Sequence, residues 1–389
     1  MDGDRPDVLL TGLLFYDLVL TGLGKPPTPG EEIWTGGMGC GPGGIANLAV
    51  AASRFGLRTS LATVFGDDFY GGYCQDVLGG QEGVDLSLSR TADGWPTPVT
   101  VSFAHDHDRA LLTHGQEPPY SQDVLMGDPP DALTALVHIE ARPREWLAKA
   151  AANGTRIYAD VGWDPSQEWP TALLEQLSLC HAFLPNEAEA MAYTRTDSAP
   201  AALGTLSELV PVAVVTRGGD GAIAVDQITG EYADVPALDT DVLDATGAGD
   251  VFGASFVAAS LGGWPLAERL RFAVLAAGLS VGHHGGALAA PGWHGVDRWW
   301  RSLTDPELKR SYGFLVDRLP ANPGPPVHHA PVTPPAPNTP VAPHTPVGPQ
   351  TPFGPQTPFG PRASEGPHRP PTPPARRTGT SGVTRGPFS

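Results

Sequence analysis

Short apolar runs, each long enough for one buried strand, alternate along the chain with segments whose apolar residues recur at helical spacing. The runs lie at residues 7–10, 60–65, 136–139, 156–159, 182–184 and 212–216. One helical stripe, which Gly56 is expected to stop, consists of Ile45, Leu48, Ala49, Ala52 and Phe55. This alternation predicts an α/β fold in three layers, with a mostly parallel central sheet covered by helices on both faces.

Four further segments interrupt this rhythm. Residues 98–103 and 109–113 have the pattern of two strands around a polar turn, and residues 13–20 and 31–34 add two strand-like pieces. We expect these strands, which fall within about residues 11–36 and 97–114, to form a small projecting sheet. Such a sheet can act as a lid over a substrate or as an oligomer interface, and the sequence alone leaves both open.

The composition changes at about residue 321, since the last 69 residues contain 21 prolines. Such a stretch has too little apolar side chain to offset its ordering entropy. We therefore expect one domain over residues 1–320 and a disordered Pro/Thr-rich tail over residues 321–389. Thr-Pro steps recur there every six residues, at Thr333, Thr339, Thr345, Thr351 and Thr357. A docking strip, a phosphorylation ladder and a plain spacer are all open readings, and the tail's partner is unknown.

Charge and cysteine usage limit the location and the partners of the chain. The net charge of −18 should repel nucleic acid and anionic membrane surfaces. The apolar run at residues 8–20 is too short to span a bilayer, and the first residues lack a signal-peptide layout. Three widely spaced cysteines form no metal or disulfide pattern. These features predict a soluble, cytoplasmic protein that binds neither nucleic acid nor membrane.

The most informative segment is residues 244–250, which read Asp-Ala-Thr-Gly-Ala-Gly-Asp and precede an apolar helical stretch. Its small residues permit a tight turn and the close approach of a ligand. At the start of a helix, the backbone N–H groups of Gly247, Ala248 and Gly249 would face an anion, assisted by the helix dipole. The segment therefore predicts an anion site at a helix N-terminus.

Asp250 would lie beside that anion, in the first helical turn. A carboxylate there can accept the proton of an attacking hydroxyl group while the N–H groups stabilise charge on the transferred phosphoryl group. This predicts phosphoryl transfer to an alcohol with Asp250 as the general base. A glycine-rich turn that merely precedes an acidic first helical turn is the structural alternative.

The segment at residues 244–250 resembles the C-terminal signature of the PfkB carbohydrate kinases, the family that includes ribokinase, fructokinase and adenosine kinase. Residues 43–56 are similar to the family's N-terminal signature, a Gly-Gly pair followed by an Asn and a helix. Three more stretches that resemble family elements follow in the expected order, at residues 66–71, 185–189 and 216–221. The likeness runs from about residue 7 to residue 300. It implies a ribokinase-like fold and ATP-dependent phosphorylation of a sugar or sugar-like molecule, with Mg²⁺.

The resemblance places Asn186, Thr216, Gly218 and Gly221 at the nucleotide site, with Glu189 near Mg²⁺, through water. The residues themselves agree, since Asn186 and Glu189 follow a strand end, where ligands bind in open α/β sheets. Mg²⁺ also prefers carboxylates and water. Alternatively, Asn186 and Glu189 form a helix capping box, and the two glycines only make a turn. Both readings can hold together.

For the acceptor, the resemblance points to Asp17, Gly43, Gly44, Asn47 and Glu140. A carboxylate such as Asp17 among apolar strand residues is costly without partners, and sugar hydroxyl groups are suitable ones. Asn47 offers both a donor and an acceptor. Asp17, Asn47 and Glu140 are each alternatively a solvated loop residue. The link from the glycine pair to Asn47 is one residue shorter than in ribokinase, so the floor of the acceptor pocket is expected to differ.

Two further features bear on ions and on the acceptor. Asp244 and Thr246 match positions linked with a monovalent cation in some relatives, so K⁺ activation is an open expectation. Where fructokinase-like members show Asp-x-Asn-x-Arg, residues 160–164 read Asp-Val-Gly-Trp-Asp. The missing Asn and Arg weaken an assignment to fructokinase and leave the acceptor open.

Two alternative functions follow from the same resemblance. A nucleoside kinase would stack an aromatic side chain on a base, and Phe15, Tyr16 and Phe103 are the candidates. An inactive kinase fold that presents its tail to partners is the other alternative, but Asp250 and the glycine turn are intact. Ribokinase-like enzymes often pair through their lid sheets, so the resemblance also implies a homodimer.

Overall fold

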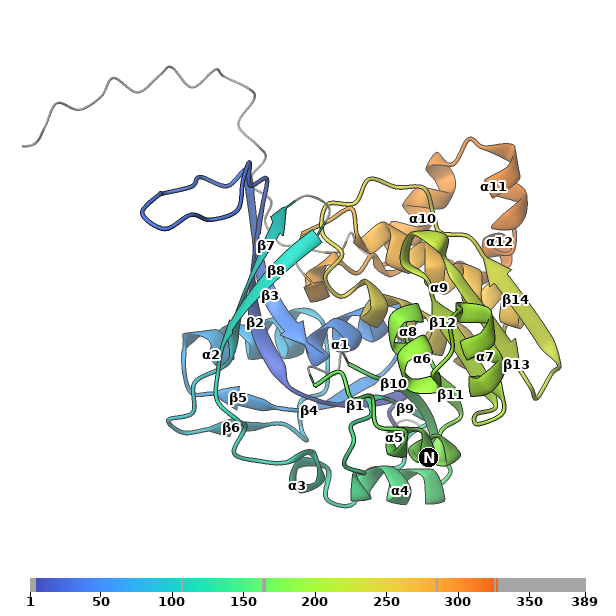
Figure 1. Ribbon diagram of the computed structural model, residues 1–389, viewed down its shortest axis with the longest axis horizontal. Coiled ribbons are helices and arrows are strands. Elements are labelled where there is room, and N and C mark those ends of the chain that lie inside the picture. Colours follow the sequence, from blue (N-terminus) through green and yellow to red (C-terminus); the bar gives the residue numbers. More distant parts are fainter. Residues whose placement is uncertain (1–4, 106–107, 163–165, 285, 325–326, 328–389) are drawn as a thin grey trace, which may run out of the picture. The chain divides into compact units, whose positions relative to one another are not determined.

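The computed structural model describes residues 5–105, 108–162, 166–284, 286–324 and 327 (Figure 1). Within these residues the main sheet has the strand order β14-β13-β12-β11-β10-β9-β1-β4. Neighbouring strands from β12 to β4 in this order pair in parallel, whereas β13 pairs antiparallel with both β12 and β14. The strands are β1 Val8–Thr11, β4 Thr59–Ala62, β9 Thr134–His138, β10 Arg156–Asp160, β11 Ala182–Phe183, β12 Val212–Thr216, β13 Ala222–Asp226 and β14 Glu231–Val235. The expected mostly parallel sheet is confirmed.

Two details of the sheet differ from expectation. The run at residues 60–65 is split, because β4 stays in the main sheet while β5 (Val64–Gly66) pairs with β6 (Arg90–Ala92). The hairpin of β13 and β14 was not anticipated at all. Its strands extend the sheet beyond β12, next to the predicted nucleotide turn.

Helices cover both faces of the main sheet (Figure 1). Alternate residues of β1 point to opposite faces: Val8 and Leu10 join a buried cluster with α1, α8 and α9, whereas Leu9 joins one with α4 and α7. The predicted three layers are therefore present. The α-helices are α1 Ile45–Arg54, α2 Phe69–Gln75, α3 Gln122–Met126, α4 Glu145–Ala152, α5 Ala172–Glu175, α6 Glu187–Thr194, α7 Ala199–Ser207, α8 Ala248–Leu261, α9 Leu266–Ser280, α10 Gly292–Ser302, α11 Pro306–Ser311 and α12 Leu315–Arg318.

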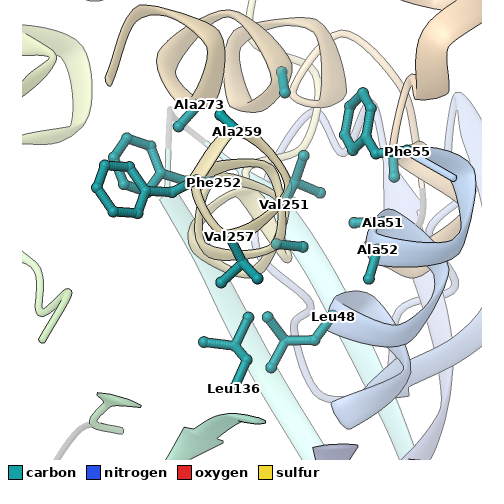
Figure 2. Close-up of a cluster of buried hydrophobic side chains, with 14 of the residues drawn as sticks. Leu48, Ala51, Ala52, Phe55, Leu136, Val251, Phe252, Val257, Ala259 and Ala273 are labelled. Carbon is teal, nitrogen blue, oxygen red and sulfur yellow. The ribbon is translucent and has the colours of Figure 1, made fainter. Parts of the chain in front are cut away.

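The packing of α1 against α8 brings the two signature segments together (Figure 2). Figure 2 shows Phe55 of the predicted stripe on the side of α8 that carries Val251, and Leu48 beside Leu136, nearer to Val257. All of these residues are at least 96% buried. As predicted, α1 ends before Gly56, which has a φ of +83°. This apolar contact sets where the first turn of α8 lies relative to α1.

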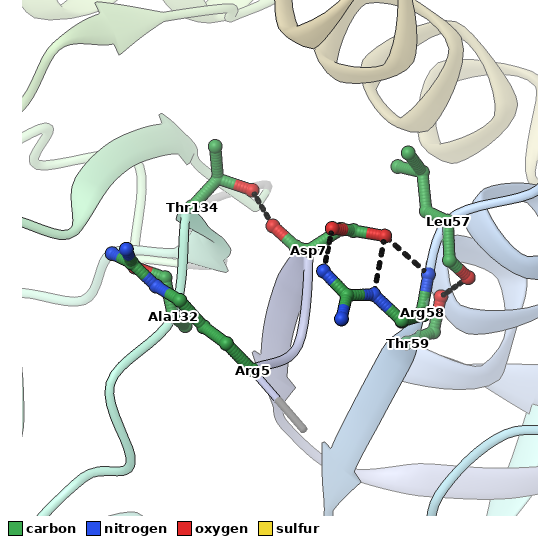
Figure 3. Close-up of polar contacts among 7 residues, drawn as sticks. All are labelled: Arg5, Asp7, Leu57, Arg58, Thr59, Ala132 and Thr134. Atoms are coloured by element: carbon green, nitrogen blue, oxygen red, sulfur yellow. Dashed lines mark hydrogen bonds and ion pairs between the residues drawn. The ribbon is translucent and has the colours of Figure 1, made fainter. Parts of the chain in front are cut away.

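A polar cluster at the start of β1 ties together three adjacent strands (Figure 3). Asp7 accepts hydrogen bonds from the backbone N–H of Arg58, at 2.8 Å, and from its guanidinium group, at 2.7 Å. The backbone carbonyl of Asp7 accepts one from the hydroxyl of Thr134, at 2.7 Å. The bond to the Arg58 side chain lowers the pKa of Asp7. These bonds fix the register of β4, β1 and β9, whose opposite ends carry the site described below.

A second sheet has the order β3-β2-β7-β8. Its strands are β2 Leu14–Thr21, β3 Gly37–Gly44, β7 Val99–His105 and β8 Asp108–His114. The small sheet was predicted, but the strand expected at residues 31–34 is wrong. That stretch has no regular structure, and the strand lies instead at β3. The turn predicted at residues 105–108 includes residues 106–107, which lie outside the described part.

The backbone of β3 lies so close to side chains of β2 that glycine is needed at several of its positions. Glycine has a low strand propensity, so the sequence analysis did not predict a strand there. A Cβ atom on Gly37 would lie 2.7 Å from the hydroxyl oxygen of Thr21, and one on Gly43 would lie 1.8 Å from Asp17 Oδ2. Larger residues would thus collide with β2. Strand formation here depends on the neighbouring strand, which the local sequence does not reveal.

Of the predicted tail at residues 321–389, the structure describes only residues 321–324 and 327. No helix in the described ranges combines the length and the apolar character that a membrane crossing requires.

Candidate active site

The glycine-rich turn forms the start of α8, as the sequence predicted. Gly247 is the N-cap and has a left-handed φ of +77°. A Cβ atom on it would lie 3.1 Å from the Asn47 side-chain amide. Glycine is therefore required both for the turn and for the close approach of α1. Asp250 occupies the first turn of the helix.

Two side chains hold the Asp250 carboxylate, one at each oxygen. Asn47 on α1 donates from Nδ2 to Oδ2 at 2.8 Å. His138, the last residue of β9, places Nε2 3.5 Å from Oδ1. The side chains of His138 and Asp250 are 40% and 18% exposed. Asp250 is therefore oriented by two elements that the sequence places far from α8.

Acidic groups surround His138. Burial alone would lower the pKa of His138, but the hydrogen bond and charge of Asp250, with the charges of Asp160 and Glu189, raise it to about 9. Burial likewise raises the pKa of Asp160 to about 7, and the charges of Glu189 and Asp250 add to this. Burial also raises the pKa of Glu189. The carboxyl groups of Asp250, Asp160 and Glu189 thus all interact with the His138 side chain near the carboxyl ends of the strands.

A cavity of about 230 Å³ opens over Asp250. Its walls include Phe15 and Gly44 from the small sheet and His138 and Glu140 from the end of β9. Glu140 forms an ion pair with Arg144. An adjoining cavity of about 340 Å³ also borders on Glu140 and shares Gly12, Leu13 and Gln122 with the first. The space over Asp250 therefore continues beyond a single small pocket.

Asp17 and Asn47 lie close to each other, and Asn47 contacts Asp250, but neither residue lines the cavity of about 230 Å³. Asp17 is only 8% exposed, and Gly43 leaves room for its carboxylate. A Cβ atom on Gly286 would lie 3.0 Å from Asn47 Oδ1 and 3.5 Å from Asp17 Oδ2. Asn47 Oδ1 is buried and has no hydrogen-bond partner within the described residues. An unpaired buried acceptor of this kind suits a hydroxyl donor of a ligand.

A larger cavity, of about 540 Å³, lies on the other side of the turn. Thr216, Gly218 and Gly221 line it, together with Ala248 and Gly249 of α8. The loop at residues 237–242 and one side of α9, which the sequence analysis missed, complete its wall. Their mixed small and apolar character offers no motif that would have revealed them.

Asn186 and Glu189 form the capping box that the sequence analysis considered as an alternative. Asn186 Oδ1 accepts from the Glu189 N–H at 3.0 Å, and Glu189 Oε2 accepts from the Asn186 N–H at 3.1 Å. Asn186 also forms a β-bridge with Thr216, so the cap of α6 lies beside the larger cavity. The structural role is therefore present, and it is compatible with the predicted nucleotide role.

Asp244 and Thr246 lie in the loop before α8. Asp244 is 5% exposed, and its Oδ1 accepts from the Thr246 N–H at 2.9 Å. This bond shapes the loop that leads into the glycine turn. The predicted K⁺ site at these residues stays a prediction.

His138 and Asp160 are site residues that the sequence analysis did not select. They are register partners on β9 and β10. His138 stands two residues before Glu140 at the end of an apolar run, and a titratable residue at such a strand end was a usable signal.

Comparison with known proteins now identifies the family. The family model described as pfkB family carbohydrate kinase matches residues 5–292. The chain belongs to this family. As a pfkB family member it is an ATP-dependent phosphotransferase that acts on an alcohol group, as the sequence predicted.

Individual relatives agree with this assignment. This pfkB chain is 28% identical over 294 residues to a nucleoside kinase of Methanothermobacter thermautotrophicus, covering 73% of this chain and 92% of the relative. It is 24% identical to the ribokinase of Arabidopsis thaliana solved with ribose and ATP, with a TM-score of 0.62, covering 76% of this chain and 98% of that one. A putative ribokinase II from E. coli, solved with ATP and Mg²⁺, is 19% identical, with a TM-score of 0.63, covering 77% of this chain and 100% of that one. The ribokinase-like fold is therefore confirmed.

Proposed function

We propose that this pfkB kinase transfers the γ-phosphoryl group of ATP to a hydroxyl group of a sugar or sugar-like molecule, with Asp250 as the general base. The observation that carries this proposal is that consecutive residues in the first turn of α8 line two different cavities. Ala248 and Gly249 line the larger cavity, whereas the next residue, Asp250, lines the cavity of about 230 Å³. A phosphate in the first and a hydroxyl group in the second would meet at this turn, which suits in-line transfer.

In the proposed reaction, Asp250 accepts the hydroxyl proton as the hydroxyl oxygen bonds to the γ-phosphorus. The bond from that phosphorus to the bridging oxygen breaks, and its electron pair leaves with ADP. The N–H groups of Gly247, Ala248 and Gly249 are the proposed anion hole, since first-turn N–H groups lack intrahelical acceptors. The Ala248 N–H donates to the Ala245 carbonyl at 3.3 Å in this structure, and a phosphate oxygen would have to replace that contact.

Asp17 and Asn47 are the proposed acceptor ligands, with Glu140 at the far wall of the cavity. The unpaired Asn47 Oδ1 and the buried Asp17 carboxylate are both hydrogen-bond acceptors by chemistry, which matches the hydroxyl donors of a sugar. Gly43 lets the backbone approach the Asp17 carboxylate, and Gly44 lets it approach Phe15, which lines the cavity. The acceptor is thus proposed to be recognised mainly through its hydroxyl groups.

The residues present fit Mg²⁺ carried by the nucleotide. Glu189 is 6% exposed, and burial raises its pKa, so a nearby cation would favour its charged form. Within the described residues, no three Asp, Glu, His or Cys side chains are grouped closely enough to hold an ion directly. We therefore assign Glu189 to Mg²⁺ through water, with Asn186, Thr216, Gly218 and Gly221 on the nucleotide. K⁺ near Asp244 and Thr246 is proposed as an activator.

A nucleoside acceptor is the second candidate, and the adjoining cavities favour it. The space of about 230 Å³ over Asp250 continues into one of about 340 Å³, so an acceptor with a substituent can be accommodated. Phe15 lines the first cavity and could stack on a base, whereas Tyr16 packs against Tyr70 and Tyr73. A nucleoside kinase is also among the relatives reported above.

Further proposals concern the whole chain. We propose that residues 1–320 form the catalytic domain, that residues 321–389 are a tail without a catalytic role, and that the small sheet mediates a homodimer. Leu112 on β8 is 65% exposed and Met38 on β3 is 47% exposed, and the strand register places both on one face of the sheet, which gives that face an apolar character.

The first test measures ADP release from MgATP over a panel of sugars, sugar acids and nucleosides, with Asp250→Asn beside the wild type. We expect one acceptor to stimulate turnover and the variant to lose at least about a hundredfold in kcat, the effect of a positioned base. Equal turnover in both proteins would refute Asp250 as the base. Equal ATP binding without any turnover would favour the inactive binding protein.

A further inference from the structure

The His138–Asp250 pair is not explained by the proposed reaction, which uses only the carboxylate. We propose that His138 is a positioning residue that aims the Asp250 carboxylate at the acceptor and, as the cation of the pair, keeps it anionic among neighbouring acids. This inference rests on the proposed function, because it assigns His138 a role through the general base. No motif of the sequence analysis points to this histidine.

The geometry restrains the carboxylate from two sides. Asn47 donates to Oδ2 at 2.8 Å, and His138 Nε2 lies 3.5 Å from Oδ1. Rotation of the carboxylate would weaken both contacts at once. Asn47 comes from a buried helix and His138 from the end of a central strand, so both partners are themselves held by the core. A base held in this way is preorganised for proton abstraction.

The charges around His138 explain why a cation is needed at this place. Asp250 faces it from α8, Asp160 from β10 and Glu189 from α6. On its own segment, Glu140 is paired with Arg144 and so is already neutralised in part. The imidazolium therefore lies among three acidic groups, next to the turn at which the proposed anionic phosphate would bind.

The position of His138 also gives it access to the site. Its side chain is 40% exposed and lines the cavity over Asp250. It therefore remains within reach of water while its Nε2 faces the carboxylate. His138 differs in this respect from Asn47, which is 5% exposed and does not line that cavity.

Substitutions can separate the hydrogen bond from the charge. His138→Gln places a neutral N–H donor near the position of Nε2, whereas His138→Leu removes both the donor and the charge. His181→Gln is the matched control, because His181 stands just before the amino end of β11 and packs against Tyr158, with 5.3 Å between ring centroids. It makes no contact with the site.

The measurement is kcat and kcat/KM between pH 5 and 10, with the acceptor found in the first test. We expect His138→Gln to lose on the order of tenfold and His138→Leu on the order of a hundredfold in kcat, with little change in either KM, because part of the base's contribution is lost. The acid limb of His138→Gln should move to higher pH. The wild type should also lose activity above about pH 9 as His138 deprotonates, a limb that the variant lacks.

Two results would overturn the inference. One is a pH profile of His138→Gln that superimposes on that of the wild type, and the other is an equal loss in His181→Gln. The double variant Asp250→Asn/His138→Leu supplies an independent check: if His138 acts through Asp250, it should be no slower than Asp250→Asn alone. Should Asp250→Asn retain full activity, the proposed base is wrong, and that failure is separate from a failure of His138. Thermal melting confirms folding, and His138→Gln carries the test if His138→Leu does not fold.

Discussion

Single residues in the acidic cluster are held in charge states that they would not have in water. Asp160 is the clearest case, since burial and the neighbouring carboxylates raise its pKa to about 7, against the opposing effects of His138 and the Val161 N–H. A carboxyl group whose pKa is raised on folding binds its proton more tightly in the native state. Its contribution to stability is therefore present at low pH and is lost as pH rises through about 7.

We predict from this that Asp160→Asn raises the thermal stability of the nucleotide-free protein at pH 8 and changes it little at pH 4.5. The substitution removes a buried charge that is costly only when ionised. Melting temperatures across this range give the measurement, with the exposed Asp197→Asn as the control. Lower stability of Asp160→Asn at pH 8 would show that the charged side chain stabilises the fold instead.

At the scale of elements, the start of α6 serves both structure and the proposed nucleotide site. The capping box of Asn186 and Glu189 satisfies backbone N–H groups at the helix start, and Asn186 forms a β-bridge with Thr216, which lines the larger cavity. The small sheet also combines a structural and a proposed binding role. The glycines of β3 pair with β2, and Gly43 among them leaves room for the Asp17 carboxylate. In both elements, local conformation and the proposed ligand contacts depend on the same side chains.

Capping and ligand binding at α6 can be separated by experiment. Asn186→Ala should cost about 1 kcal/mol of unfolding free energy through loss of the cap. It should also raise the KM for MgATP. Asn186→Ser restores a capping hydroxyl but not the amide, so we expect it to recover stability while the KM stays high. Recovery of both by the serine variant would reduce Asn186 to a structural role.

At the scale of the whole molecule, the family match and the described helices both end before the proline-rich segment begins. All groups proposed for catalysis lie between Asp17 and Gly286, and the exposed apolar residues of the small sheet lie within the same span. Neither turnover nor pairing through that sheet should therefore require residues 321–389.

We accordingly predict that a chain cut after Pro320 keeps kcat within about twofold of the full chain, because no proposed catalytic contact is lost. Light scattering on the shortened chain should give the mass of a dimer at micromolar concentration, and Leu112→Glu should reduce it to a monomer. A collapse of kcat on truncation would assign the tail a catalytic role, and a monomeric shortened chain would rule out the lid dimer.

Much of the fold and part of the site could be predicted because the signals are local. The predicted bounds of β12, residues 212–216, agree with the structure, and α1 ends just before Gly56, as predicted. Strand β3 was missed because its pairing depends on contacts with β2 rather than on propensity. His138 and Asp160 were missed because nothing in the short apolar runs of β9 and β10 shows that their ends meet a helix from the C-terminal half of the chain.

The sequence by itself determined the α/β class, the glycine turn with Asp250 behind it, and the kinase family. Each of these depends on residues that are neighbours in the chain, where spacing dictates turns, caps and periodicity. Only the tertiary structure decided which groups surround Asp250. Asn47 is 203 residues away in sequence yet donates to the carboxylate at 2.8 Å. The raised pKa values are likewise properties of the packed molecule, because burial raises that of Asp160 and the carboxylates of distant segments raise that of His138 only once these segments come together.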